Sequence, residues 1–529
     1  MPDDILALLR TGYAFEGPAI DLGAAVVDGA ADADTQVRLP LAMMNRHGLV
    51  AGATGTGKTK TLQLMAEQLA AGGVPVFLAD VKGDVSGIAT PGEQSDRISK
   101  RVADVGGNPW VPTGFPAEFY ALGGIGPGIP LRARMTSFGP TLLSKVLGLN
   151  DVQTSSLGLV FHYADGAGLD LDDVKDLRAV IGYLASDDGA KDLEQLGGLS
   201  KATAGVLLRE LVSFSDQGAD AFFGEPEFDS ADLLRVAPDG RGIVSCLELP
   251  AVQDRPALFS TFLMWLLADL FHDLPEVGDV EKPKLVFFFD EAHLLFHDAS
   301  KDFLDSIAQT VRLIRSKGIG VFFVTQTPTD VPDEVLAQLG NRVQHALRSF
   351  TPADAKALKA TVSTFPRSSY DLETLLTQLG IGEAVVTVLS ENGAPTPVAW
   401  TRLRPPASRM GPLEPATLSA SVSASPLAAR YSAAIDDESA FEKLQSRAPT
   451  PAAAQAERQA APPPPVQDAP LEESHRTAAA GGLGAAAGIL ASPMFRSFAR
   501  SAATVAGREI ARSIFGTAPR RRSASRRRH

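Results

Sequence analysis

The chain has 529 residues, of which 45% are apolar and 21% are charged, and its formal net charge is −13. This composition is ordinary for a globular protein of more than one domain, and it excludes a chain that binds nucleic acid through its overall charge. The only cysteine, Cys246, lies in an apolar run, so a disulfide within the chain and a cysteine-based zinc site are excluded as well.

The beginning of the chain shows no targeting pattern. Met1 to Asp4 have neither the basic nor the apolar region of a secretion signal. The most apolar helix candidate, 257–270, is shorter than the roughly 20 residues of a membrane span and carries Asp269. We therefore expect a cytoplasmic protein without an integral membrane segment. Short apolar runs broken by Gly and Asp predict a short N-terminal β segment in residues 1–45.

A phosphate-binding loop follows. It is formed by Gly52, Ala53, Thr54, Gly55, Thr56, Gly57, Lys58 and Thr59, which match G-x-x-x-x-G-K-[ST] at every fixed position. An apolar stretch of strand length precedes it, and apolar residues at helical spacing follow it. Glycines let backbone N–H groups approach phosphates, and the helix N-terminus adds positive potential. Lys58 is expected to reach the β- and γ-phosphates, and the Thr59 hydroxyl to hold Mg²⁺.

Residues 74–130 are predicted to add a strand and a surface loop to the phosphate-loop unit. Residues 74–80 predict a second buried strand, which ends in the charged stretch Asp80 to Asp84, where α/β sheets bind ligands. Lys82 and Asp84 can equally cap the following turn. Residues 108–130 are rich in Gly and Pro and predict a surface loop. We assign 46–130 to the first part of an ATPase-type core.

A long helical region separates the two halves of that core. Helical periodicity recurs in 138–147, 151–163, 174–184 and 201–214, so 131–239 is predicted to be a mostly helical insertion. Strand-length apolar runs then return in 242–249, 284–290, 320–325 and 383–389, alternating with helices at 256–273, 300–317 and 351–362. This alternation predicts a parallel α/β sheet with helices on both faces, and it assigns 240–405 to the second part of the core.

The strand 285–289 ends in two carboxylates, Asp290 and Glu291, which fits the Walker B pattern. Asp290 would hold Mg²⁺, and Glu291 would orient and polarise the attacking water. His293 and His297 have the i, i+4 spacing of a metal pair, although no third-ligand pattern accompanies them.

Three further residues are candidates for catalysis. Gln326 follows the strand 320–325 and would face the γ-phosphate, or bond backbone at the strand end. An arginine that stabilises transition-state charge is often supplied by a neighbouring subunit. Arg315 and Arg342 flank the Gln326 strand, and we prefer Arg315; either can instead form an ion pair at a surface or interface.

The end of the chain changes character twice. Residues 406–475 are dominated by Ala, Pro, Ser and Glu and predict a disordered linker. Residues 476–529 form a basic tail, with ten arginines and one glutamate between 496 and 528. Arginines at multiples of four, with apolar residues between them, predict a helix. Such a tail could bind nucleic acid, an anionic membrane or the acidic body of the protein itself.

Together these motifs resemble the HerA/FtsK superfamily of ring ATPases, and within it the HerA-like, YjgR-like bacterial family. The resemblance rests on the phosphate loop, the stretches 80–84, 222–226, 282–285, 289–293 and 338–345, the helix carrying Arg312 and Arg315, and Thr325–Gln326. It covers about 10–405 and, more weakly, 480–522. It implies a RecA-like P-loop core, ATP and Mg²⁺ as ligands, hexamers, and ATP sites completed by an arginine in trans. About 45 residues precede the loop, too few for the N-terminal barrel that docks the nuclease partner of HerA itself.

Three functions compete at this point. The first is an ATP-driven motor on DNA, a helicase or translocase that contacts phosphates without sequence preference. The second is an ATPase that moves or remodels protein. The third, a nucleotide-gated binding protein, is disfavoured because a pure switch does not need Glu291.

Overall fold

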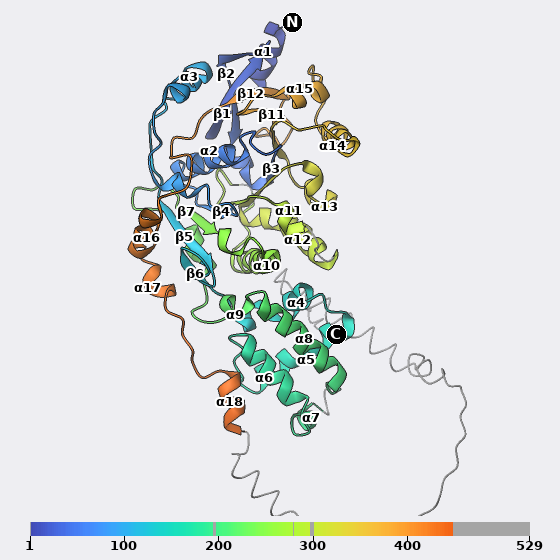
Figure 1. Cartoon of the computed structure of the whole chain (residues 1–529). Coiled ribbons are helices and arrows are strands. Elements are labelled where there is room, and N and C mark those ends of the chain that lie inside the picture. Colours follow the sequence, from blue (N-terminus) through green and yellow to red (C-terminus); the bar gives the residue numbers. More distant parts are fainter. Residues whose placement is uncertain (1, 194–196, 279, 297–300, 448–529) are drawn as a thin grey trace, which may run out of the picture.

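The computed structural model describes residues 2–193, 197–278, 280–296 and 301–447 (Figure 1). Its centre is one twelve-stranded mixed sheet with the order β2-β1-β12-β11-β10-β3-β9-β8-β4-β7-β5-β6. The strands are β1 (Ala19–Val27), β2 (Ala30–Pro40), β3 (Gly48–Ala51), β4 (Val76–Asp80), β5 (Ala117–Leu122), β6 (Ile129–Leu131), β7 (Val244–Glu248), β8 (Leu285–Phe289), β9 (Ile319–Thr325), β10 (Asn341–Gln344), β11 (Glu383–Thr387) and β12 (Ala399–Leu403).

Helices cover the sheet and extend beyond it. The α-helices that belong to the sheet domain are α1 (Pro2–Gly12), α2 (Lys58–Ala71), α3 (Asp96–Val105), α10 (Pro256–Asp273), α11 (His293–Phe296), α12 (Lys301–Ile314), α13 (Asp333–Leu336), α14 (Pro352–Ser363) and α15 (Leu372–Gln378). Short 3₁₀ helices are η1 (Leu41–Arg46), η2 (Ser86–Ala89), η4 (Ser230–Leu234), η5 (Pro250–Val252), η6 (Arg315–Lys317) and η7 (Pro328–Asp330).

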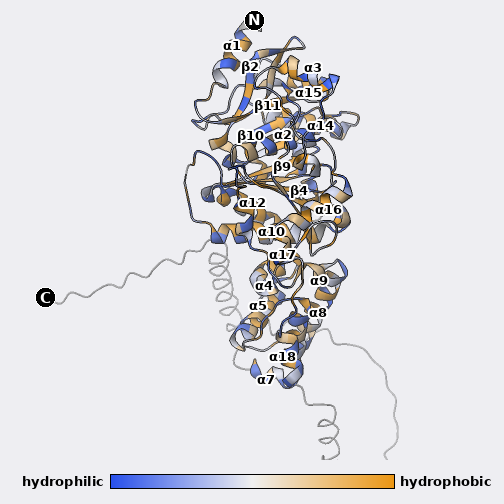
Figure 2. Ribbon diagram, turned by 90° about the vertical axis from the view of Figure 1, so that its left-hand side faces the viewer, coloured by the Kyte–Doolittle hydropathy of each residue, from blue (hydrophilic) through white to orange (hydrophobic). Residues whose placement is uncertain are grey.

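The eight strands from β10 to β6 are mutually parallel, and their apolar sequences explain why they lie at the centre. A parallel strand is covered on both faces, so every residue of β8 is apolar and buried. Successive side chains point to opposite faces: Phe288 packs with α2, whereas Phe287 and Phe289 pack with α10 and α12. Figure 2 shows apolar residues concentrated in central strands such as β4 and β9.

The parallel sheet is confirmed over these eight strands, and antiparallel strands extend it at one end. β11, β12, β1 and β2 follow β10 as antiparallel neighbours. Residues 388–398 connect β11 to β12, and an antiparallel bridge between Leu389 and Pro395 within them makes the connection a hairpin, which is compatible with antiparallel pairing. The N-terminal segment supplies β1 and β2 as expected, and it also begins with α1, which the sequence analysis did not predict.

The Gly- and Pro-rich stretch 108–130 is not a surface loop along its whole length. It contributes β5 and β6, and Phe119 and Tyr120 at the centre of β5 are fully buried. Tyr120 pairs with Leu247 of β7 and with Ile129 of β6. Pro130 lies in β6 at the edge of the sheet, where a missing N–H donor is tolerated.

The four helices predicted within residues 131–239 are present as α4 (Met135–Val146), α5 (Asp151–Gly166), α6 (Val174–Leu184) and α8 (Lys201–Asp216). The short helices α7 (Gly189–Asp192) and α9 (Ala219–Phe222) were not predicted. Capping boxes at Asn150 and Asp173 start α5 and α6, each with its side chain accepting a bond from the third helical residue. This helical region lies at one end of the molecule, away from α1 (Figure 1).

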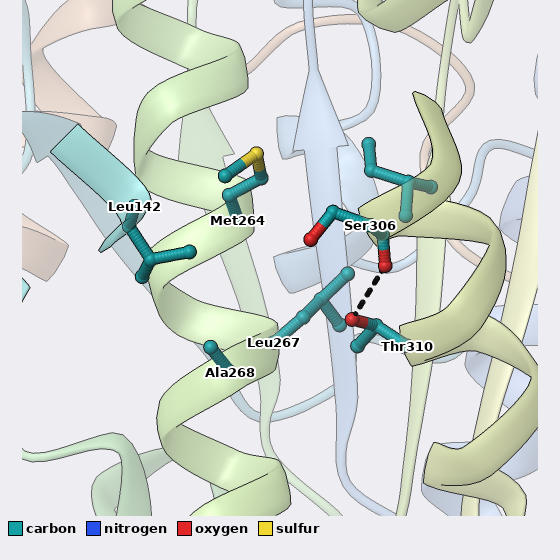
Figure 3. A pocket seen from close by; sticks show the side chains of 7 residues that line it. Leu142, Met264, Leu267, Ala268, Ser306 and Thr310 are labelled. Carbon is teal, nitrogen blue, oxygen red and sulfur yellow. Dashed lines mark hydrogen bonds between the residues drawn. The ribbon is translucent and has the colours of Figure 1, made fainter. Parts of the chain in front are cut away.

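The helical region meets the sheet domain where α4 packs against α10 and α12 (Figure 3). Lys145 of α4 donates to the Ser306 hydroxyl of α12 at 2.7 Å. The cavity between Leu142, Met264 and Thr310 measures about 10 Å³, which leaves room for about one water molecule. This junction is therefore a packing interface and not a ligand site.

The prediction that 406–475 is a disordered linker is wrong for residues 406–447. These residues form α16 (Pro415–Ala424), α17 (Ala428–Tyr431) and α18 (Ala440–Arg447). We call 406–447 the C-terminal strap, because it runs from the sheet domain along β5 and β6 to α6 of the helical region (Figure 1). Few large apolar residues are present, but Leu413, Leu418 and Tyr431 are buried against other elements. Residues 448–475 and the basic tail 476–529 lie outside the described residues.

Among the helices within the described ranges, none combines the length and the apolar character needed to cross a membrane.

Candidate nucleotide-hydrolysis site

The predicted phosphate loop connects β3 to α2, which is the strand–loop–helix context that the motif requires. Gly52 has φ +155°, and a Cβ atom there would lie 2.5 Å from the Cβ of His345, so only glycine fits. Neighbouring strand ends hold the loop: Gly52 N–H donates to the Thr325 carbonyl at 3.2 Å, and Ala53 N–H to the Ala346 carbonyl at 2.8 Å. The loop is therefore shaped by β9 and β10 on either side of it.

Lys58 is buried at the start of α2, with its Nζ over the loop. The ammonium donates to the Gly52 carbonyl at 2.7 Å and to the Ala53 carbonyl at 3.3 Å. Burial lowers the pKa of Lys58, and the nearby charge of Glu291 opposes that shift. Thr59 follows in the first turn of the same helix and is half-buried. The two residues thus bring a cation and a hydroxyl to the positive end of a helix dipole.

His345 supports this loop, and the sequence analysis did not single it out. Its Nε2 lies 2.9 Å from the Thr61 hydroxyl of α2, and the ring is fully buried. Burial lowers the pKa of His345 to about 4, so the imidazole is neutral at physiological pH. His345 thereby links the end of β10 to the first turns of α2.

Asp290 and Glu291 follow β8 directly, two strands away from the phosphate loop. Asp290 is 1% exposed, and within the described part of the chain its Oδ2 has no hydrogen-bond partner. Burial raises the pKa of Asp290 to about 7, with Glu291 and Asp80 adding to the shift against the ammonium of Lys82. Glu291 has φ +48°, a conformation that non-glycine residues rarely adopt and that occurs often at functional sites.

Asp290 belongs to an acidic group that also contains Asp80 and Asp84. One potential ligand atom from each of the three lies within 4.8 Å of the others. The Asp80 carboxylate is used by the turn after β4, where it accepts bonds from the N–H groups of Gly83, Asp84 and Val85. Asp84 Oδ1 is buried without a partner among the described residues, as Asp290 Oδ2 is. Two such carboxylate oxygens are hard donors that fit Mg²⁺.

Both Glu291 oxygens face basic groups. Lys82 Nζ donates to Oε1, and His293 Nδ1 lies 3.2 Å from Oε2. Burial alone would raise the pKa of Glu291, but the ammonium of Lys82 more than offsets it, so this pKa is lowered. The Asp80 to Asp84 stretch therefore contributes Lys82 to the site. His297, the second residue of the predicted histidine pair, lies outside the described residues.

Gln326 follows β9, which lies between the phosphate-loop strand β3 and the carboxylate strand β8. Its side chain is exposed, whereas the adjacent Thr325 and Thr327 are tied to Asp330 at 2.7 and 2.9 Å. The structure thus places Gln326 at the same edge of the sheet as the loop and the carboxylates.

The two candidate arginines occupy different places. Arg315 is exposed in η6, before the first residue of β9, whereas the phosphate loop is at the other end of the strands. Seven residues of β9 put it about 20 Å from its own loop. Arg342 is half-buried within β10, donates to the Thr364 hydroxyl and pairs in register with Leu49. Neither arginine lies at the edge of the sheet that carries the phosphate loop.

Comparisons with known proteins fit this geometry. The family model described as Helicase HerA-like C-terminal matches residues 26–523. No curated protein matches the chain. Among solved structures, the plasmid coupling protein TrwB in complex with ADP and Mg²⁺ is similar with a TM-score of 0.50 at 17% identity, over 76% of this chain and 98% of that chain.

Two further structures are similar at a lower score. They are an unbound form of the bacterial conjugative coupling protein TrwBΔN70, with a TM-score of 0.49 at 16% identity over 75% of this chain and 91% of that chain, and VirB4 of Thermoanaerobacter pseudethanolicus, with a TM-score of 0.45 at 16% identity over 73% of this chain and 97% of that chain. At these identities the comparison with the TrwB–ADP complex establishes a shared fold.

Proposed function

The chain belongs to the HerA-like helicase C-terminal family, and we propose that it is a Mg²⁺-dependent ATPase that works as a ring motor on DNA. One observation carries the proposal: the strand order brings the phosphate loop, Gln326 and the carboxylates Asp290 and Glu291 to one edge of the sheet. The TrwB structure of the same fold holds ADP and Mg²⁺, which supports ATP and Mg²⁺ as the ligands of this chain.

Each of these residues has a role in the proposed reaction. The loop N–H groups and Lys58 would bind the phosphates, and Thr59 and Asp290 would hold the metal ion. When bound, Mg²⁺ would neutralise charge on the β- and γ-phosphates. Glu291 would accept a proton from the attacking water as the new P–O bond forms, while the bridging P–O bond breaks and its electron pair leaves with ADP. Gln326 would orient the same water.

The placement of Arg315 supports a ring. It lies far from the loop of its own subunit, so a catalytic role requires a neighbouring copy to present it across an interface. A hexamer whose ATP sites lie between subunits provides this arrangement. An arginine supplied in this way increases turnover by about 10³- to 10⁵-fold in P-loop NTPases.

The proposal is tested by the ATPase rate of the full chain, with and without single- and double-stranded DNA, and with Glu291→Gln as the inactive control. A DNA motor should hydrolyse ATP faster when DNA of any sequence is present, and the stimulation should weaken with added salt. An ATPase rate that neither single- nor double-stranded DNA changes would contradict a DNA motor. It would favour the alternative, an ATPase that moves or remodels protein.

A further inference from the structure

Lys82 stands between two carboxylates that belong to neighbouring strands. On one side it donates to Glu291, which follows β8. On the other side it lines a cavity of about 220 Å³ together with Glu248, the last residue of β7. Since β4 lies between β8 and β7, the turn after β4 places Lys82 beside the ends of both strands.

The backbone of this turn is fixed, so the Lys82 side chain is the part that can move. Asp80 accepts hydrogen bonds from three successive backbone N–H groups, those of Gly83, Asp84 and Val85. Gly83 has φ +70°, and a Cβ there would lie 2.9 Å from Pro250. The Lys82 side chain, by contrast, is 43% exposed and has four rotatable bonds.

Glu248 has no partner for its charge in the described structure. The residue is 4% exposed, and its Oε1 is buried without a hydrogen bond to any described residue. Burial and the nearby Asp80 raise the pKa of Glu248 to about 8. A buried carboxylate is costly unless a cation or a proton compensates it. Lys82 is the one basic residue among the described residues that line the cavity.

Glu291 is not available as a base while Lys82 holds it. Its Oε1 accepts the bond from Lys82, and its Oε2 faces His293. The Lys82 ammonium therefore occupies the oxygen that would otherwise accept a hydrogen bond from the attacking water. ATP hydrolysis therefore requires the Lys82 ammonium to move away from Glu291.

We propose that Lys82 is a brake on hydrolysis, with Glu291 as its partner in the inactive arrangement and Glu248 as its partner in the active one. The cavity provides the space into which the side chain swings. The C-terminal strap contributes Leu413 and Leu418 to the lining of that cavity, so the strap forms part of the place that would receive the Lys82 side chain. This inference rests on the proposed ATPase activity and adds a regulatory pair to it.

The test is a double-mutant cycle on the full chain, using Lys82→Ala, Glu248→Gln and their combination. Glu248→Gln should lower kcat about tenfold, because Lys82 then stays on Glu291. Lys82→Ala should raise kcat about threefold or more, and the double variant should match Lys82→Ala, because the effect of residue 248 acts only through Lys82. The Kd of a fluorescent ATP analogue should stay within about twofold throughout, since neither residue holds the phosphates.

The exposed Lys359→Ala and Glu373→Gln are matched controls for loss of a charge of each sign. A large fall in kcat for Lys82→Ala, or a fall in the double variant as deep as in Glu248→Gln alone, would overturn the brake. Should Lys82→Ala unfold, Lys82→Gln keeps the stem of the side chain and replaces it in the cycle. A wild-type chain that does not hydrolyse ATP would overturn the proposed function, and this inference with it.

Discussion

Lys58 and Glu291 act on different parts of the proposed reaction, so their substitution should separate ATP binding from hydrolysis. Lys58→Ala removes the cation at the phosphate loop and should abolish both tight binding and turnover. Glu291→Gln leaves every phosphate-binding group in place, so ATP should bind while hydrolysis falls to background. Titration with a fluorescent ATP analogue and a phosphate-release assay measure the two effects. Loss of ATP binding in a folded Glu291→Gln variant would contradict the role given to Glu291.

Arg315 should be needed for turnover in trans. Arg315→Ala should leave ATP binding nearly intact and lower kcat by about 10³-fold or more, because an arginine that acts across an interface increases turnover by about 10³- to 10⁵-fold. Mixing this variant with Glu291→Gln should restore part of the activity, because some interfaces then contain both Arg315 and Glu291. Arg342→Ala is the comparison. If a mixture of Arg342→Ala with Glu291→Gln regains ATPase activity and a mixture of Arg315→Ala with Glu291→Gln does not, the role in trans belongs to Arg342.

The site residues that could be predicted from the sequence are those that belong to a local motif. The phosphate loop, Asp290 and Glu291 are read from a strand and the few residues after it, and the strand ends bring them together. The contact between Lys82 and Glu291 joins residues 209 positions apart, and that between Thr61 and His345 joins residues 284 apart. No local pattern encodes such pairs. The available signals were the charged stretch at the end of β4 and the stretch 338–345, which ends in His345 and resembles the family.

At the scale of elements, the C-terminal strap depends on α2. Glu67 accepts bonds from the backbone N–H groups of Ala407 and Ser408 at 2.6 and 3.1 Å, and from the Ser408 hydroxyl at 2.9 Å. Gln63 Nε2 donates to the same hydroxyl at 2.7 Å. The helix that begins at Lys58 therefore also anchors the strap.

Ser408→Ala should destabilise the protein by about 1–3 kcal/mol, because it leaves buried groups of Glu67 and Gln63 with fewer partners. Urea denaturation measures the change, and the exposed Ser419→Ala in α16 is the control that should alter stability little. Equal stability of the two variants would show that the polar contacts of Ser408 do not hold the strap.

The C-terminal strap was predicted to be disordered from its composition, and this prediction was wrong. Residues 406–447 contain too few large apolar residues to form a core of their own, which is why disorder was predicted. Leu413, Leu418 and Leu444 instead complete cores built by other elements. The Gly- and Pro-rich stretch 108–130 was misread for a related reason, because β5 becomes a strand by pairing with β7, which lies more than 100 residues further along the chain.

At the scale of the whole molecule, the parallel order from β10 to β6 gathers the candidate site at one edge of the sheet. Alternating apolar runs were enough to predict this α/β class. They could not predict the antiparallel end, because the pairing of β12 with β1 joins distant parts of the chain. The C-terminal part of the basic tail differs sharply in charge from the rest of the chain: 496–528 carries +9 in a chain of net charge −13, so all other residues together carry −22.

This asymmetry leads to a prediction for the tail, 476–529, which lies outside the described residues. If the tail tethers the motor to DNA, its deletion should weaken DNA binding, and each lost phosphate contact should reduce the salt slope by about 0.9. Fluorescence anisotropy with labelled duplex DNA at several salt concentrations measures both. The ATPase rate without DNA should change little, because Lys58, Asp290 and Glu291 are all retained. An unchanged affinity and slope would exclude the tether and leave docking of the tail on the acidic body of the protein.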